Sequence, residues 1–196
     1  MKILTILGSP RREGNTAIAL GWMEQRLSGQ GHRIDRADVI DYAVAGCDDC
    51  RKCKEPGNDL CAHDDGANSL FRRMMQADLI ILATPLYCWS FPAQLKALVD
   101  RMHCMTEGLT GRPEHRSRLE GKTLAMLMTA GGGFPKNIDL LTAGYENLSD
   151  SLKTRQVEPF IIPFVHDPAA MGEETRKRAE EIADAWTDAA AAAITG

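Results

Sequence analysis

The sequence contains no apolar run close to the roughly 18 residues that a membrane-spanning helix needs. Its first ten residues, MKILTILGSP, hold too few consecutive apolar residues for the hydrophobic region of a signal peptide. The formal net charge is −4, which gives the chain no electrostatic reason to bind DNA, RNA or an anionic membrane surface. From these absences we expect a cytoplasmic protein with no nucleic-acid or membrane partner.

Internal repeats and linkers rich in proline, glycine or serine are also absent, and 196 residues are enough to bury a substantial core. We therefore expect a single domain that spans residues 1–196. Because the cytoplasm is reducing, the six cysteines favour metal binding or catalysis over a disulfide framework.

Apolar segments of strand length alternate with segments of helical periodicity along the chain. The predicted strands are 2–7, 32–39, 77–87, 122–130 and 156–165, and the predicted helices are 16–29, 66–76, 92–105, 138–152 and 172–194. Such alternation is typical of a three-layer α/β sandwich, a parallel sheet with helices on both faces. The last strand carries two prolines and the second is weakly patterned, so we place both at edges. The resulting order 2-1-3-4-5 is flavodoxin-like, and ligands of such folds bind beyond the carboxyl ends of strands 1, 3 and 4.

The loop after the first strand, GSPRREGNT at 8–16, has the composition of an anion site. It opens onto a helix, whose free N–H groups and positive dipole end attract negative charge. Its polar and charged side chains include Ser9, Arg11, Arg12, Asn15 and Thr16. The loop lacks the GK[ST] ending of a P-loop and the G-x-G-x-x-G pattern of a dinucleotide site, so a monoester phosphate such as that of FMN fits better. The alternative is a ligand-free helix start capped by Asn15 or Thr16.

The next two strand ends supply features of a ring-binding site. TPLYCWSFP, at 84–92, brings Tyr87, Trp89 and Phe91 to the mouth of the predicted crevice, where aromatic walls suit a flat heteroaromatic ring. TAGGGFP, at 129–135, offers backbone N–H groups that can approach ring carbonyls closely. The alternatives are aromatic side chains that close the core or meet a second subunit, and a flexible glycine turn.

The segment GCDDCRKCKEPGNDLCAHDD, at 46–65, gathers four of the six cysteines in a C-x2-C-x2-C run followed by a fourth cysteine. The four are Cys47, Cys50, Cys53 and Cys61. This compact spacing is closer to iron–sulfur motifs than to zinc sites, which separate two C-x2-C pairs by a longer loop. His63 is a further candidate ligand, and five aspartates crowd negative charge around the thiols. An iron–sulfur cluster, a metal-free thiol loop and a zinc site all stay open.

Taken together, GSPRREGNT, the cysteine run, ADLIILATPLYCWSFPAQLKALVDR and TAGGG resemble the NADPH-dependent FMN reductase and iron–sulfur flavoprotein family over residues 2 to about 135. The resemblance implies FMN, NADPH or NADH as the reductant, a [4Fe–4S] cluster on the four cysteines, and a homodimer or homotetramer. The FMN contacts that it implies are Ser9, Pro10, Arg11, Asn15, Thr16, Ala17, Pro85, Leu86, Tyr87, Trp89, Ala130, Gly131 and Gly132. We interpret Asp100 and Arg101, a DR pair that recurs in the family, as a structural ion pair.

The leading hypothesis is an FMN-dependent NAD(P)H oxidoreductase that passes electrons to a quinone, a free flavin, a nitro or azo compound, or a metal ion. Flavin chemistry depends on stacking and orientation more than on an acid–base side chain, so we assign no catalytic residue. Two alternatives stay open: a non-enzymatic electron carrier between partner proteins, and a binding module that keeps the fold without the cofactor. The polar connection at 106–120 is a candidate lid or interface arm.

Overall fold

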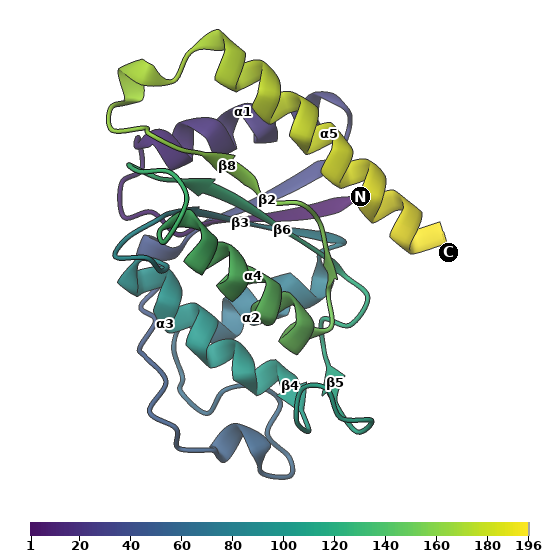
Figure 1. Cartoon of the computed structure of the whole chain (residues 1–196). Coiled ribbons are helices and arrows are strands. Elements are labelled where there is room, and N and C mark those ends of the chain that lie inside the picture. Colours follow the sequence, from purple (N-terminus) through teal and green to yellow (C-terminus); the bar gives the residue numbers. More distant parts are fainter. Residues whose placement is uncertain (196) are drawn as a thin grey trace.

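A mixed-length parallel sheet forms the centre of the computed structural model, which describes residues 1–195 (Figure 1). The strands of this sheet are β1 (Lys2–Leu7), β2 (Arg33–Asp38), β3 (Leu79–Pro85), β6 (Thr123–Thr129), β7 (Arg155–Gln156) and β8 (Phe160–Ile162). They lie in the order β2-β1-β3-β6, and both β7 and β8 pair with β6. Every pairing is parallel, which confirms the flavodoxin-like order 2-1-3-4-5.

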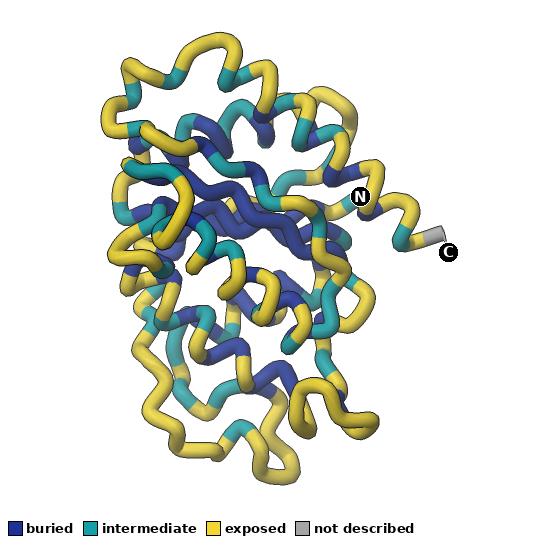
Figure 2. The backbone as a smooth tube through the Cα atoms, viewed as in Figure 1, coloured by how far each residue is buried: buried dark blue, intermediate teal, exposed yellow. Residues whose placement is uncertain are grey.

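Burial of the strands follows their position in the sheet. All seven residues of β3 and all seven of β6 are buried, as expected for central parallel strands covered on both faces. In β2 only one of the six residues is buried, which suits an edge strand. Figure 2 shows the buried tube of the sheet running between two more exposed helical layers.

Helices cover both faces of the sheet. One layer consists of α1 (Asn15–Gly29) and α5 (Glu173–Thr195), and the other consists of α2 (Gly66–Gln76), α3 (Ala93–Arg101) and α4 (Ile138–Leu152) (Figure 1). Each layer has its own apolar core against the sheet, with Trp186 and Met23 on the first side and Phe71 and Tyr145 on the second. Among the described residues, no helix combines the length and apolar character needed to cross a membrane.

Short elements complete the chain and refine two expectations. The 3-10 helices are η1 (Val39–Asp41), η2 (Lys52–Lys54), η3 (Met102–Met105) and η4 (Pro168–Ala170). The helix expected over 92–105 is therefore α-helical to Arg101 and then tightens into η3. The connection at 106–120 contains a two-stranded antiparallel hairpin of β4 (Thr106–Glu107) and β5 (Arg116–Ser117).

The last predicted strand is an edge strand, but it is interrupted over residues 157–159, which include Pro159. Proline has no N–H to give to the ladder, so the chain leaves the sheet there and rejoins it as β8. Side chains take over as donors at the gap. Tyr145 Oη donates to Val157 O at 3.0 Å and to Leu124 O at 2.7 Å, and Trp186 Nε1 donates to Glu158 O at 3.0 Å.

Removing the Tyr145 hydroxyl tests this arrangement. Tyr145 is fully buried, and its hydroxyl is the donor for two carbonyls of neighbouring strands. Tyr145→Phe should lower the free energy of unfolding by about 1–2 kcal/mol in a urea titration, because Val157 O loses its donor, while Leu124 O still accepts from Val157 N at 3.3 Å. Tyr87→Phe is the matched control: Tyr87 is 41% exposed, and its change should stay within about 0.5 kcal/mol. Equal effects of the two substitutions would contradict the role given to Tyr145.

Candidate functional site

The carboxyl ends of β1, β3 and β6 meet at one edge of the sheet, where the loops that follow them enclose a cleft of about 220 Å³. Its walls are Ser9, Arg11, Gly14, Asn15, Thr16, Pro85, Leu86, Tyr87, Thr129, Ala130, Gly131, Val165 and His166. The cleft thus brings together all three loops that the sequence singled out, from segments far apart in the chain.

The N-terminus of α1 points into this cleft without a side-chain cap. Gly14 occupies the capping position and provides no side-chain hydrogen bond, so the expectation of a cap by Asn15 or Thr16 is wrong. Asn15 Nδ2 instead donates to Val165 O at 3.3 Å, and Thr16 Oγ1 lies 2.6 Å from Thr129 Oγ1. Asn15 Oδ1 is buried and has no hydrogen-bond partner within residues 1–195. No side chain therefore caps the N–H groups of the first turn, and the positive end of the helix dipole faces the cleft.

The two arginines of the first loop have different roles. Arg12 pairs with Asp41 and lies 3.5 Å from Asp38, and the hydrogen bond to Asp41 raises the pKa of Arg12. Arg11 lines the cleft and takes part in no ion pair within the described chain. Its backbone N–H donates to Ser9 Oγ at 3.1 Å, which holds the loop in shape. Of the two, Arg11 is the cation available to a ligand.

A tight turn follows β3 and forms the aromatic wall. Tyr87 and Ser90 exchange two backbone hydrogen bonds of 3.0 and 2.9 Å. The two residues between them, Cys88 and Trp89, have φ angles of 46° and 62°, in the left-handed region that non-glycine residues rarely adopt. Tyr87 lines the cleft, whereas the 59% exposed Trp89 lies outside the lining.

The glycines after β6 have a steric role. A Cβ atom on Gly131 would lie 2.9 Å from His166 Cε1, and one on Gly132 would lie 2.8 Å from Asn137 Nδ2. Val165 N donates to Ala130 O at 3.0 Å, so a backbone hydrogen bond joins the loop after β8 to the glycine loop. Close packing against His166 and Asn137 therefore accounts for these glycines.

Nine of the thirteen expected contacts line the cleft, and the other four do not: Pro10, Ala17, Trp89 and Gly132. Four lining residues were not expected, namely Gly14, Thr129, Val165 and His166. The last two follow β8, whose carboxyl end reaches the same edge of the sheet as the others. The rule that ligands bind beyond the carboxyl ends of parallel strands, applied to the fifth strand as well, would have predicted both residues.

The four clustered cysteines line a second cavity, at the carboxyl end of α3. Cys47 and Cys50 are exposed, whereas Cys53 and Cys61 are half-buried. All four face one enclosed space of about 30 Å³, and helix α3 and its 3-10 extension contribute Arg101, His103 and Cys104 to its wall. The structure therefore brings together residues up to fourteen positions apart in the loop. Figure 1 shows this loop as the long segment below α3.

Ion pairs and hydrogen bonds clamp the cysteine loop at both ends. Asp65 caps α2 by accepting from Ala67 N at 3.0 Å, accepts from Ala45 N at 3.0 Å, and pairs with Arg101. Lys54 Nζ donates to His103 O at 2.6 Å. The expected pair between Asp100 and Arg101 is wrong, because successive helical residues point in different directions.

Asp100 pairs instead with Lys96, one helical turn earlier, at 2.5 Å. Arg101 points to the opposite side, into the core and the cysteine loop.

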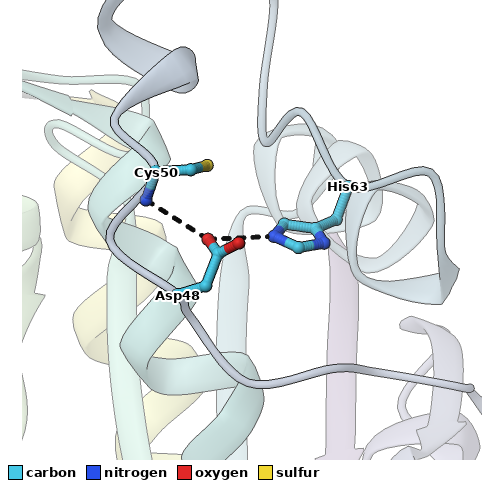
Figure 3. Close-up of side chains that lie close together, drawn as sticks. All are labelled: Asp48, Cys50 and His63. Carbon is cyan, nitrogen blue, oxygen red and sulfur yellow. Dashed lines mark hydrogen bonds and ion pairs between the residues drawn. The ribbon is translucent and has the colours of Figure 1, made fainter.

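Asp48, Cys50 and His63 lie close together and line the cysteine cavity (Figure 3). Asp48 Oδ1 is 3.1 Å from His63 Nε2 and accepts from Cys50 N at 3.2 Å. The hydrogen bonds from His63 and Cys50 lower the pKa of Asp48 to about 2. The three ligand atoms lie within 4.8 Å of one another, and such a mixed set suits zinc. His63 and Asp48 line the same cavity as the four cysteines, and Cys50 belongs to both candidate ligand sets.

The fold is an α/β protein of flavodoxin-like architecture, with the uncapped start of the first helix at its cleft. A family model for NADPH-dependent FMN reductase matches residues 1–143. An iron-sulfur flavoprotein of Archaeoglobus fulgidus is 30% identical over 185 residues, which cover 93% of this chain and 77% of that protein. One of Methanosarcina thermophila is 38% identical over 101 residues, 52% of each chain.

Among solved structures, an NAD(P)H:quinone oxidoreductase from Methanothermobacter marburgensis superimposes with a TM-score of 0.67 at 20% identity, covering 93% of this chain and 97% of the other. That likeness shows the fold. The chain belongs to the NADPH-dependent FMN reductase family, and it is accordingly an FMN-dependent oxidoreductase. The match to the second iron-sulfur flavoprotein spans only about half of that protein's length.

Thiol labelling tests how the cysteines are distributed. In metal-free protein at pH 8, a maleimide should modify the exposed Cys47, Cys50 and Cys88 first and Cys104 last. Cys104 is 6% exposed, and burial raises the pKa of its thiol to about 12, so little reactive thiolate is present. Mass spectrometry of timed samples gives the order, and full labelling in urea is the control. Early modification of Cys104 would contradict the packing described.

Proposed function

We propose that the protein is an NAD(P)H oxidoreductase that holds FMN in the cleft and reduces a small acceptor such as a quinone, a flavin, a nitro or azo compound, or a metal ion. The observation that carries this proposal is the helix start at Gly14, which has no side-chain cap and faces a cleft that also contains Arg11. A helix N-terminus with an unpaired arginine beside it attracts a phosphate dianion.

The residues of the cleft fit FMN in charge and in shape. Its phosphate would take the N–H groups of the first turn of α1 together with Ser9, Arg11 and Thr16, and the expected contacts at Pro10 and Ala17 belong to the same loop. Asn15 Oδ1 supplies a buried acceptor that lacks a donor within the described chain, as a ligand hydroxyl would provide. Bound FMN would supply the capacity to accept a hydride and to return its electrons to a second substrate.

The ring of the cofactor would lie between the turn after β3 and the glycine loop after β6. Pro85, Leu86 and Tyr87 form one wall, and the backbone at Ala130 and Gly131 forms the other. We keep Trp89 and Gly132 as proposed contacts: both border the lining, and Trp89 projects from the strained turn. Orientation by these walls is what the protein contributes, so no catalytic side chain is proposed.

We also propose a [4Fe–4S] cluster on Cys47, Cys50, Cys53 and Cys61. Four thiols facing one cavity are the soft ligand set of such clusters. Arg101 Nε and Nη2 are buried at this cavity without a hydrogen-bond partner in the described residues, as expected where an anionic group belongs. Cys53 and Cys61 are half-buried and Cys47 and Cys50 are exposed, so the cavity is bounded by thiols on its inner side and on its solvent side.

The remaining properties follow the family resemblance. We propose one domain over residues 1–196, a homodimer or homotetramer, and a cytoplasmic location, whose reducing conditions keep the thiols free. The open mouth of the cleft, beside the exposed Tyr87 and Trp89, gives a small planar acceptor access to the ring.

The two arginines of the first loop provide a matched test of FMN binding. Arg11→Ala should raise the Kd for FMN by about tenfold or more, because a hydrogen bond to a charged group contributes about 1.5–3 kcal/mol. Arg12→Ala should change it by less than about threefold, since Arg12 is committed to Asp41. Fluorescence titration of the apoprotein measures both, and riboflavin, which has no phosphate, should not distinguish the variants. Equal weakening by both substitutions would place the phosphate elsewhere.

Anaerobic mixing with nucleotides tests the reaction. NADPH or NADH should bleach the visible absorbance of the purified flavoprotein within minutes, and a quinone should restore it. Iron and acid-labile sulfide should each be present at about four per chain if the cysteines hold the cluster. Reduction by a ferredoxin but by neither nucleotide would favour the electron carrier. A colourless protein that fails to take up FMN would favour the cofactor-free binding module, and zinc without sulfide would favour the zinc site.

A further inference from the structure

Arg101 is the largest fully buried side chain of the described residues, and most of its hydrogen-bonding capacity is unused. Its side chain is 0% exposed. Only Nη1 has partners, namely Asp65 and, at 3.3 Å, Ala45 O. Nε and Nη2 have none within residues 1–195. A guanidinium presents five N–H donors, so the greater part of this group faces the cysteine cavity without acceptors.

Such an arrangement is costly unless something else accepts the hydrogen bonds. A buried charge without full pairing destabilises a protein strongly, and each unsatisfied donor adds to the penalty. Cys61 is a half-buried sulfur on the wall of the same cavity as Arg101. Sulfur is a weak acceptor as a thiol and a much stronger one as a thiolate.

We propose that Arg101 donates from Nε and Nη2 to the cysteine sulfurs at Cys61, and so sets the reduction potential of the group that those sulfurs hold. The inference rests on the [4Fe–4S] cluster proposed above. Arg101 acts through the sulfur ligands and is therefore a positioning residue.

The sign of the effect follows from charge. A cluster of two ferric and two ferrous ions with four sulfides and four thiolates has a net charge of −2, and one electron makes it −3. A fixed, desolvated cation beside the sulfurs stabilises the more negative form more strongly, so Arg101 raises the midpoint potential. Hydrogen bonds to the sulfurs act in the same direction.

A purely structural reading also fits Arg101, because its pair with Asp65 joins α3 to the loop and to the start of α2. A second arginine, Arg51 of the loop, distinguishes this structural role from an effect on the reduction potential. Arg51 lines the same cavity, but its side chain is 79% exposed and its partner is Asp49. Water and salt screen the charge of Arg51, whereas the buried Arg101 is shielded from solvent and is offset only by its pair with Asp65.

The experiment compares wild-type protein with Arg101→Lys, Arg101→Met and Arg51→Met. Each is reconstituted with iron and sulfide under anaerobic conditions and titrated potentiometrically, with the cluster followed by electron paramagnetic resonance and the flavin by absorbance. Arg101→Lys keeps the charge for Asp65 but loses the planar donors, so it serves where Arg101→Met fails to fold.

Arg101→Met should lower the cluster potential by at least a tenfold change in the reduced-to-oxidised ratio, about 59 mV for one electron, and Arg101→Lys should lower it by less, because it keeps the charge and loses only the planar donors. Arg51→Met should change that ratio by less than about twofold. The flavin potential should not move in any variant. An unchanged cluster potential in the folded Arg101 variants, or an equal shift in Arg51→Met, would overturn the inference and leave the proposed cluster standing. Wild-type protein that takes up no iron or sulfide would overturn both.

Discussion

Burial of β3 and β6 on both faces is the constraint on which the rest of the structure depends. Their fourteen residues are all buried, so helices must cover the sheet above and below. Because every strand pairing is parallel, the strands all end at the same edge of the sheet, and the loops that follow them gather there. The cleft is a consequence of this topology, and the individual side chains refine it.

Helix α3 connects the two proposed sites. Near its amino end, a Cβ atom on Gly8 would collide with the Leu95 side chain, 2.9 Å from its Cβ, so the start of the first loop packs directly on α3. At its carboxyl end, Arg101 and Cys104 reach the cysteine cavity. One rigid element therefore positions both loops, and the turn at Cys88–Trp89 lies just before its first residue. Neither site can shift far without repacking against this helix.

Periodicity and strand-end rules predicted the elements and most of the cleft. The bounds of α2 and α4 agree with the expected helices because their apolar residues recur at strict helical spacing. Such patterns do not predict which charged side chains form ion pairs with one another. Nothing in the sequence distinguishes Arg11 from its neighbour Arg12, and only the folded position of Asp41 shows which of them is committed. The same limit produced the wrong pair at Asp100, whose partner is set by the direction of helical side chains.

Charge compensation explains how an acidic loop can hold four thiolates. Of its five aspartates, four are paired: Asp48 with His63, Asp49 with Arg51, Asp59 with Arg118, and Asp65 with Arg101. Two of these pairs, those of Asp49 and Asp59, are exposed ion pairs with arginine, which offset the carboxylate charge and contribute little to stability, and Asp48 Oδ1 lies 3.1 Å from His63 Nε2. The fourth pair joins Asp65 to the buried Arg101. The single carboxylate of Asp65 does not accept all of the hydrogen bonds that the guanidinium can donate. The remaining donors face the sulfurs, so the crowding of acids that argues against an anionic cluster in the sequence is offset in the folded loop.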